Sequence, residues 1–166
     1  MFTEKTVQEL ALLLGDKLTQ AGLVAATAES CTGGGVAYAI TEISGSSLWF
    51  DRSFVTYSND AKMQMLNVDK NLIDKFGAVS EPVVEAMAMN AVKASEADIS
   101  VAISGIAGPN GGSAEKPVGT VCFSWYNAHG GGKTETYQFV GDRSEVRTQA
   151  IRLALSGLIN IIETSK

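Results

Sequence analysis

Two short apolar runs that each end in a glycine-containing turn constrain this chain most strongly. Residues 23–28 run into the segment 29–35, which closes with three consecutive glycines, and residues 99–103 run into the segment 104–109. Continuous apolar runs of this length are typical of strands buried on both faces, as in sheets covered by helices. The two runs therefore predict a central sheet whose strand ends carry turns that a ligand can approach closely.

Helices are predicted around these strands by apolar residues that recur at helical spacing. The first spans 7–18, where Thr6 and Glu9 match a capping box and Gly22 supplies a stop signal. Further helices are predicted at 36–40, 59–66, 72–76, 82–94 and 144–163, and further strands at 49–57, 118–126 and 134–140.

The order of these elements predicts the fold class. Strands and helices alternate early in the chain, whereas the last two strands form a hairpin around a glycine-rich tip. This order predicts an α/β fold, a three-layer α/β/α sandwich on a mixed, mainly parallel sheet. We expect a single domain over 1–166, because no repeat and no domain-scale linker interrupts the chain.

Charge and cysteine content narrow the class of function. The net charge of −5 argues against binding to nucleic acid or to an anionic membrane, but it leaves room for a small anionic substrate. Only Cys31 and Cys122 are present, and the amino terminus lacks the pattern of a signal peptide, so we expect a cytoplasmic protein. Cys31, Cys122 and His129 lack the spacing of metal ligands, and we expect neither a metal nor another cofactor.

Ser30 is the first candidate for catalysis. It is expected at a strand-to-helix turn, exposed at the sheet edge, where the amides of Thr32, Gly33 and Gly34 are available to a substrate. A plain helix N-cap, served by Ser30 or Thr32, is the alternative. Cys31 is a rival nucleophile, since Glu29, Lys62 and Cys31 would form a set like that of the nitrilases, with a buried packing cysteine as its own alternative.

Lys62 is the candidate base, because the only histidine, His129, belongs to the hairpin tip. A lysine can act as a base where burial or a nearby cation lowers its pKa, although a lone lysine is more often a solvated surface charge. Tyr57 lies shortly upstream and can relay a proton or hold the amine; its alternative is an aromatic that packs at the end of a strand.

Two further groups are candidates for binding the substrate. Arg143 and Arg147 lie at the predicted start of the last helix, a favourable place for a phosphate or carboxylate, unless they pair with acidic neighbours on the same helix. Ser104 and Gly105 form the second glycine turn and offer another set of backbone donors for a developing oxyanion.

Five separated motifs together resemble the CinA C-terminal domain family of nicotinamide-nucleotide amidases. They lie at 28–34, 57–62, 77–80, 104–109 and 116–121. The resemblance implies hydrolysis of the carboxamide of nicotinamide mononucleotide to nicotinic acid mononucleotide and ammonia. It implies a serine nucleophile at Ser30, with Lys62 and Tyr57 completing the active site, on a three-layer α/β/α fold.

The substrate-binding residues and the assembly complete the prediction. The expected substrate-binding residues are Glu29, Thr32, Gly33, Gly34, Ser104, Gly105, Arg143 and Arg147. We expect a nucleotide as the small-molecule partner and a homodimer as the assembly. Two alternatives remain open: a thiol amidase that uses Cys31, and a non-catalytic nucleotide-binding or regulatory module.

Overall fold

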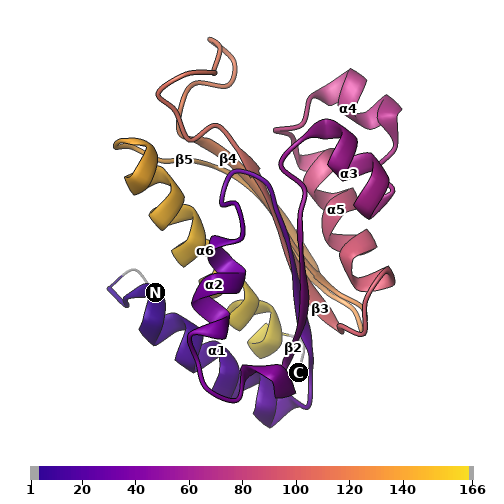
Figure 1. Ribbon diagram of the computed structural model, residues 1–166, viewed down its shortest axis with the longest axis vertical. Helices are drawn as coiled ribbons and strands as arrows, with labels where there is room; N and C mark the ends of the chain where they lie inside the picture. The colour runs from indigo at the N-terminus through magenta and orange to yellow at the C-terminus, as the bar shows by residue number, and fades with distance from the viewer. Residues whose placement is uncertain (1–3, 165–166) are drawn as a thin grey trace.

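A computed structural model describes residues 4–164 and shows a five-stranded sheet between two layers of helices (Figure 1). The strand order across the sheet is β2-β1-β3-β4-β5. The strands are β1 (Ala25–Glu29), β2 (Phe50–Val55), β3 (Ile99–Gly105), β4 (Thr120–Asn127) and β5 (Gly132–Gln138).

The pairing of these strands gives a mixed sheet. β1 pairs with β2 and β3 in parallel, β4 is antiparallel to β3, and β5 is antiparallel to β4. Four of the five strands therefore point in one direction, which confirms the predicted mixed, mainly parallel sheet. In the register of the parallel part, Glu29 lies beside Val55 and Ile103. The residues that follow these three consequently meet at one edge of the sheet.

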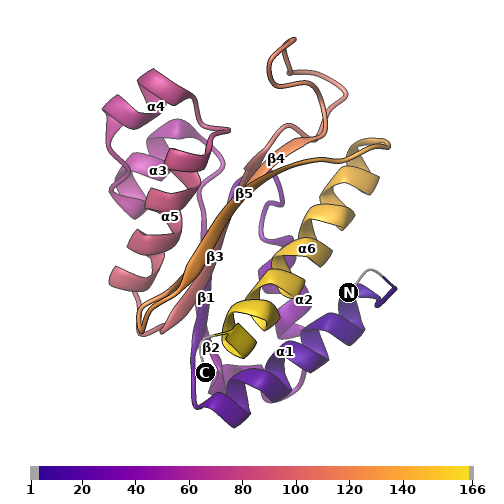
Figure 2. The same ribbon diagram turned by 180° about the vertical axis from the view of Figure 1, so that it is seen from behind.

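The two faces of the sheet are covered by different helices. α1, α2 and α6 lie on one face and α3, α4 and α5 on the other, as the two opposite views show (Figures 1 and 2). Their bounds are α1 (Val7–Ala21), α2 (Gly35–Thr41), α3 (Asn59–Leu66), α4 (Lys70–Phe76), α5 (Glu81–Lys93) and α6 (Arg143–Thr164), with a short 3₁₀ helix at Ser46–Leu48. The predicted three-layer α/β/α sandwich is thus confirmed.

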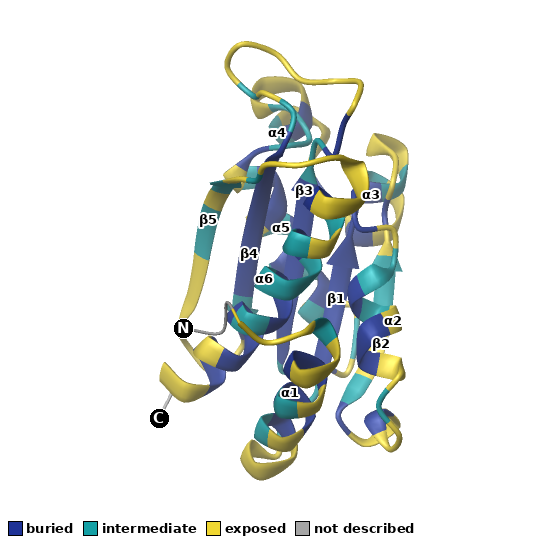
Figure 3. Cartoon of the chain, turned by 90° about the vertical axis from the view of Figure 1, so that its left-hand side faces the viewer, coloured by how far each residue is buried: buried dark blue, intermediate teal, exposed yellow. Residues whose placement is uncertain are grey.

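The apolar core is split by the sheet into two clusters. The larger includes Leu14, Phe123 and Leu158 between the sheet and the α1/α6 layer, and the smaller includes Val84 and Met87 of α5 on the opposite face. β1 is buried at every position, as expected for a strand whose two faces are both covered (Figure 3). Since both faces of the sheet are covered, the strand ends are where side chains can meet a ligand.

The first helix shows that local sequence signals act as predicted. The Thr6 hydroxyl accepts a hydrogen bond from the Glu9 amide, and the Glu9 side chain accepts one from the Thr6 amide, forming the capping box. Gly22 ends the helix in a left-handed conformation, with φ of 66°. Among residues 4–164, no helix combines the length and the apolar character needed to cross a membrane.

Candidate active site

Ser30 follows β1 directly at the edge where the parallel strands end. Its amide donates to the carbonyl of Ile103 in β3 (2.9 Å), which fixes it to the centre of the sheet. The turn after it is possible because Gly33 and Gly34 adopt left-handed backbone conformations, with φ of 60° and 94°. Gly34, not Ser30, is the N-cap residue of α2, so the helix-cap alternative for Ser30 is wrong.

The Ser30 side chain is buried rather than exposed as predicted, because a lysine packs against it. Only 8% of Ser30 is accessible, and the Nζ of Lys62 lies 3.1 Å from its Oγ. Lys62 reaches this position from α3, which Ser58 begins as N-cap by accepting a bond from the Ala61 amide. The turn after β1 and a side chain of α3 therefore meet at the end of β1.

Lys62 is a buried amine that bonds to two neutral oxygens. It is 1% exposed, and its Nζ donates to the carbonyl of Thr56 at 3.0 Å. In the described chain its ammonium forms no ion pair with a carboxylate. Burial lowers the pKa of Lys62 below its usual value, with Cys31 acting weakly in the opposite direction. The surface-charge alternative for this lysine is therefore wrong.

This pair has the geometry of a nucleophile and its base. A neutral Lys62 can donate to the Thr56 carbonyl while its lone pair accepts the Ser30 hydroxyl proton. The distance of 3.1 Å is within direct hydrogen-bonding reach, the first requirement for a general base. The arrangement can activate a serine hydroxyl without histidine.

Cys31 has the wrong environment for a nucleophilic thiolate. Its side chain is buried, and this burial raises the pKa of the Cys31 thiol to about 11 despite the opposing influence of its own backbone amide and of Arg147. The thiol therefore stays protonated near neutral pH, whereas reactive cysteines have a lowered pKa. The geometry favours the alternative of a buried packing cysteine.

Glu29 lies behind the turn rather than in an open site. It is completely buried, and its carboxylate accepts hydrogen bonds from the Thr32 hydroxyl (2.8 Å) and from the amides of Val36 (2.9 Å) and Ala37 (3.0 Å). Thr32 is also completely buried. Both side chains are therefore occupied by contacts within the protein. That Glu29 and Thr32 bind the substrate stays a prediction, and for Thr32 it concerns the main-chain amide.

Backbone donors remain available in the turn. The amides of Gly33 and Gly35 donate to the carbonyls of Ser30 and Thr32. Within residues 4–164 the structure gives the amides of Thr32 and Gly34 no protein acceptor. These two amides can receive a developing oxyanion. Ser104 and Gly105, the alternative donors, end β3 beside the same strand edge, with Ser104 almost completely buried.

The two arginines at the start of α6 are turned toward the loops at this edge. Arg147 donates to the carbonyls of Cys31 (3.1 Å) and Thr32 (3.2 Å) and so binds the turn that carries Ser30. Arg143 donates to the Gly108 carbonyl (2.8 Å) and to the Tyr57 hydroxyl (3.1 Å). Neither forms an ion pair with a carboxylate in the described chain, so the predicted alternative of pairing along the helix is wrong.

Tyr57 differs from its expected placement. It is 63% exposed, and its hydroxyl accepts from Arg143, whereas the Lys62 amine is buried against Ser30 and Thr56. The structure therefore brings Tyr57 to the arginine side of the site rather than to the amine. A relay from Tyr57 to Lys62 has no direct bond to support it.

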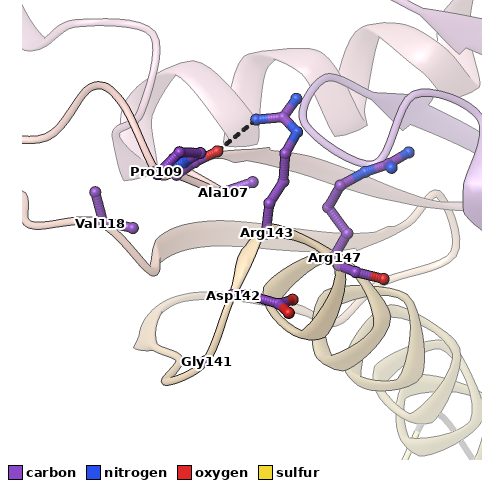
Figure 4. Close-up of a pocket in the computed structure, with 9 residues that line it drawn as sticks. Ala107, Pro109, Val118, Gly141, Asp142, Arg143 and Arg147 are labelled. Atoms are coloured by element: carbon purple, nitrogen blue, oxygen red, sulfur yellow. Dashed lines mark hydrogen bonds between the residues drawn. The ribbon is translucent and has the colours of Figure 1, made fainter.

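A cavity of about 670 Å³ lies beside the arginines (Figure 4). The 107–109 segment, Val118 and the first residues of α6 line it, and Arg143 reaches across to the loop. Ser30 is not among its lining residues; the connection is Arg147, which lines the cavity and binds the serine-bearing turn. Asp142 caps α6 by accepting from the Glu145 amide, so its carboxylate already takes up a donor at the start of this helix. The groups that can bind an anion in the cavity are therefore the arginine side chains.

The sequence of this chain matches a known protein family. Residues 7–162 match the CinA C-terminal domain. The chain belongs to the CinA C-terminal domain family. It is 54% identical over 156 residues to the nicotinamide-nucleotide amidohydrolase PncC of Escherichia coli strain K12, covering 94% of each chain. It is 49% identical over 158 residues to the protein of the same name from Pseudomonas putida, covering 93% of this chain and 96% of the relative.

A solved structure agrees with this placement in the CinA family. The crystal structure of the competence/damage inducible protein CihA from Agrobacterium tumefaciens is similar with a TM-score of 0.92 at 46% identity, covering 93% of this chain and 94% of the other. The recognised resemblance to this family, made from five motifs, is thereby confirmed.

Sequence reasoning missed two carbonyl groups in this CinA-family site. The Thr56 carbonyl holds the Lys62 amine, and the Gly108 carbonyl holds Arg143. Backbone carbonyls have no signature in the sequence. The only signal was their position, since Thr56 directly precedes the 57–62 motif and Gly108 lies within the 104–109 motif. His129, as predicted, lies in the exposed hairpin turn, 3.0 Å from Asp98. Residues 4–164 contain no cluster of three or more His, Cys, Asp or Glu side chains placed to hold a metal.

Proposed function

We propose that this chain is an amidohydrolase of nicotinamide nucleotides, converting nicotinamide mononucleotide to nicotinic acid mononucleotide and ammonia. Two relatives that cover nearly the whole chain bear the name nicotinamide-nucleotide amidohydrolase. The single observation that carries the chemistry is the distance of 3.1 Å between the Lys62 amine and the Ser30 hydroxyl. A buried amine beside a serine supplies the base that amide hydrolysis needs.

Acylation begins with attack of the Ser30 Oγ on the carboxamide carbon. Neutral Lys62 accepts the hydroxyl proton as the new C–O bond forms, and the Thr56 carbonyl keeps the amine in place. The oxyanion of the tetrahedral intermediate accepts bonds from the amides of Thr32 and Gly34. The ammonium of Lys62 then gives its proton to the departing nitrogen, the C–N bond breaks, and ammonia leaves an ester on Ser30.

Deacylation repeats the same steps with water. Lys62, neutral again, accepts a proton from water as the water oxygen attacks the ester carbon, and the same amides receive the oxyanion. Collapse of the second tetrahedral intermediate breaks the ester C–O bond and returns the proton from Lys62 to the Ser30 Oγ. The products are a carboxylic acid and the original enzyme.

The phosphate of the nucleotide is assigned to the cavity beside Arg143 and Arg147. Both guanidinium groups lack a carboxylate partner in the described chain, and they line the cavity near the serine-bearing turn. Guanidinium groups bind phosphate through charge-assisted hydrogen bonds. In this assignment Tyr57 orients Arg143 through its hydroxyl.

Two other functions are less well supported. A thiol amidase needs a Cys31 thiolate, which the raised pKa of about 11 opposes. A non-catalytic nucleotide-binding module has no need of a buried amine held against a serine, because burying an amine is costly. The expected homodimer stays a prediction, and light scattering of the purified protein measures it.

Ammonia release tests the proposed function. Purified protein is incubated with nicotinamide mononucleotide, free nicotinamide or the nicotinamide dinucleotide over a range of pH, and ammonia is measured with a coupled assay. The proposal predicts release from the mononucleotide in preference to free nicotinamide. Absence of release from all three at every pH overturns the enzymatic function and leaves the binding module.

A further inference from the structure

We propose that Glu29 is the positioning residue of this reaction, holding the Ser30 turn in reach of Lys62 without exchanging a proton itself. The inference rests on the proposed function for its kinetic part. It assigns to a buried carboxylate a task different from the substrate contact expected from the sequence and from the acid or base of a nitrilase-like set.

The carboxylate of Glu29 joins the strands to the start of α2. On the strand side it accepts from the hydroxyls of Thr27 (3.0 Å) and Ser53 (3.3 Å), and on the helix side from the amides of Val36 (2.9 Å) and Ala37 (3.0 Å). The turn that carries Ser30 lies in the sequence between Thr27 and the two α2 amides. The carboxylate thereby links the two ends of the turn by hydrogen bonds.

A further bond reaches into the turn itself. The Thr32 hydroxyl donates to the Glu29 carboxylate at 2.8 Å, and Thr32 provides one of the two amides proposed to receive the oxyanion. From the opposite side, Arg147 donates to the Thr32 and Cys31 carbonyls. The Glu29 carboxylate, as an acceptor, and the Arg147 guanidinium, as a donor, thus hold the same short loop from two sides.

The main chain of Glu29 fixes the base as well. Its carbonyl accepts from the Thr56 amide at 2.8 Å, and the Thr56 carbonyl in turn accepts from the Lys62 amine at 3.0 Å. Glu29 is therefore joined directly through the peptide bond to Ser30, the proposed nucleophile, and through Thr56 to Lys62, its base. A shift of this residue moves both ends of the 3.1 Å contact.

Glu29 is unsuited to proton transfer. It is completely buried, and both carboxylate oxygens already accept bonds, among them two from main-chain amides that cannot reverse their polarity. The carboxylate also takes up the amides of Val36 and Ala37 at the start of α2, so these amides are not available to an anionic substrate group. This leaves the phosphate to the arginines of α6.

The first test compares Glu29→Gln with the wild type. Glutamine keeps the shape but presents an NH₂ group to donors, and either orientation leaves one of the two main-chain amides without its acceptor. We expect kcat for nicotinamide mononucleotide to fall roughly 10-fold or more, as the loss of a charge-assisted bond predicts, with KM changed less than about 2-fold. The pH midpoint of the activity should stay at the wild-type value, because Lys62 remains the base.

A matched control separates positioning from general destabilisation. The buried Ser100 hydroxyl donates to the Ala88 carbonyl (2.6 Å), with Ala88 in the core cluster on the opposite face of the sheet. Ser100→Ala should lower the melting temperature while kcat stays at the wild-type value. The proposal is overturned if Glu29→Gln loses stability as Ser100→Ala does but keeps full kcat. Loss of the pH-dependent limb in Glu29→Gln also overturns it, because that result identifies an acid or base.

A second variant decides the matter if Glu29→Gln fails to fold. Thr32→Val removes only the hydroxyl that reaches Glu29, and we expect a lower kcat that Thr32→Ser largely restores. Full kcat in Thr32→Val overturns the proposal.

Hydrogen exchange tests the same idea without turnover. Amides of residues 31–36 should exchange faster in Glu29→Gln or Thr32→Val than in the wild type, with Ser100→Ala unchanged there. An inactive wild type refutes the proposed function alone, whereas unchanged exchange in residues 31–36 of the variants refutes the positioning role.

Discussion

The Nζ of Lys62 lies 3.1 Å from the Oγ of Ser30, although the two residues are 32 positions apart in the chain. Ser30 begins the turn after β1, and Lys62 comes from the first turns of α3 across the end of the sheet. The contact exists because adjacent parallel strands end at one edge and send their following segments over it. The proposed chemistry depends on this contact.

Lys62→Arg should be nearly as damaging to turnover as Lys62→Ala. Arginine keeps the positive charge but does not give up its proton in a protein, so it cannot serve as a base. Steady-state ammonia release from the two variants measures this. Near wild-type kcat in Lys62→Arg would show that the residue acts through its charge alone.

Activity should rise with pH as Lys62 loses its proton. Burial lowers the pKa of Lys62, so the midpoint of the rise should lie below the usual lysine value of 10.5. A profile of kcat/KM against pH reports this ionisation in the free enzyme. A rate that falls across the same range would contradict a neutral amine as base.

Lys62→Met should stabilise the protein while abolishing turnover. Because the pKa of Lys62 is lower in the folded state, the unfolded chain binds the proton more readily, and protonation opposes folding below pH 10.5. At neutral pH we expect the melting temperature to rise by roughly 2–4 °C, the change that about 1 kcal/mol gives in a domain of this size. The advantage over wild type should shrink as the pH approaches 10.5.

Arg143→Ala should raise KM roughly 10-fold or more while changing kcat less, because a phosphate clamp acts in both the ground state and the transition state. The loss should disappear with the phosphate-free nicotinamide riboside. Arg147→Ala should lower kcat in addition, since Arg147 also holds the carbonyls of Cys31 and Thr32. Equal wild-type kinetics on the mononucleotide and the riboside would show that the arginines do not bind the phosphate during the reaction.

The local parts of this site could be predicted because their signals are local. Glycines with left-handed conformations follow Ser30, and the capping serine before α3 places Lys62 in its first turns. The resemblance named both residues as a pair. Their burial could not be predicted, because a lone lysine in a sequence carries no sign of whether a serine and a carbonyl will enclose it.

The parts that sequence reasoning misplaced depend on contacts between distant segments. Tyr57 meets Arg143, which lies 86 positions away, and no local pattern links them. Glu29 was expected among the substrate-binding residues, but its carboxylate accepts from donors in α2 and β2 that only the folded chain assembles. The strand order β2-β1-β3-β4-β5 is likewise set by packing between distant segments, whereas the β4–β5 hairpin is local and was predicted.

Ammonia release by Ser30→Ala and Cys31→Ala tests the central claim most directly. Both variants are assayed with saturating nicotinamide mononucleotide, and thermal melts verify that they are folded. The account predicts a loss of at least about 10³-fold in kcat for Ser30→Ala, the scale on which removing a nucleophile acts. Cys31→Ala should retain substantial activity, since the Cys31 thiol has a pKa of about 11. An active Ser30→Ala together with an inactive, folded Cys31→Ala would contradict the account and identify Cys31 as the nucleophile.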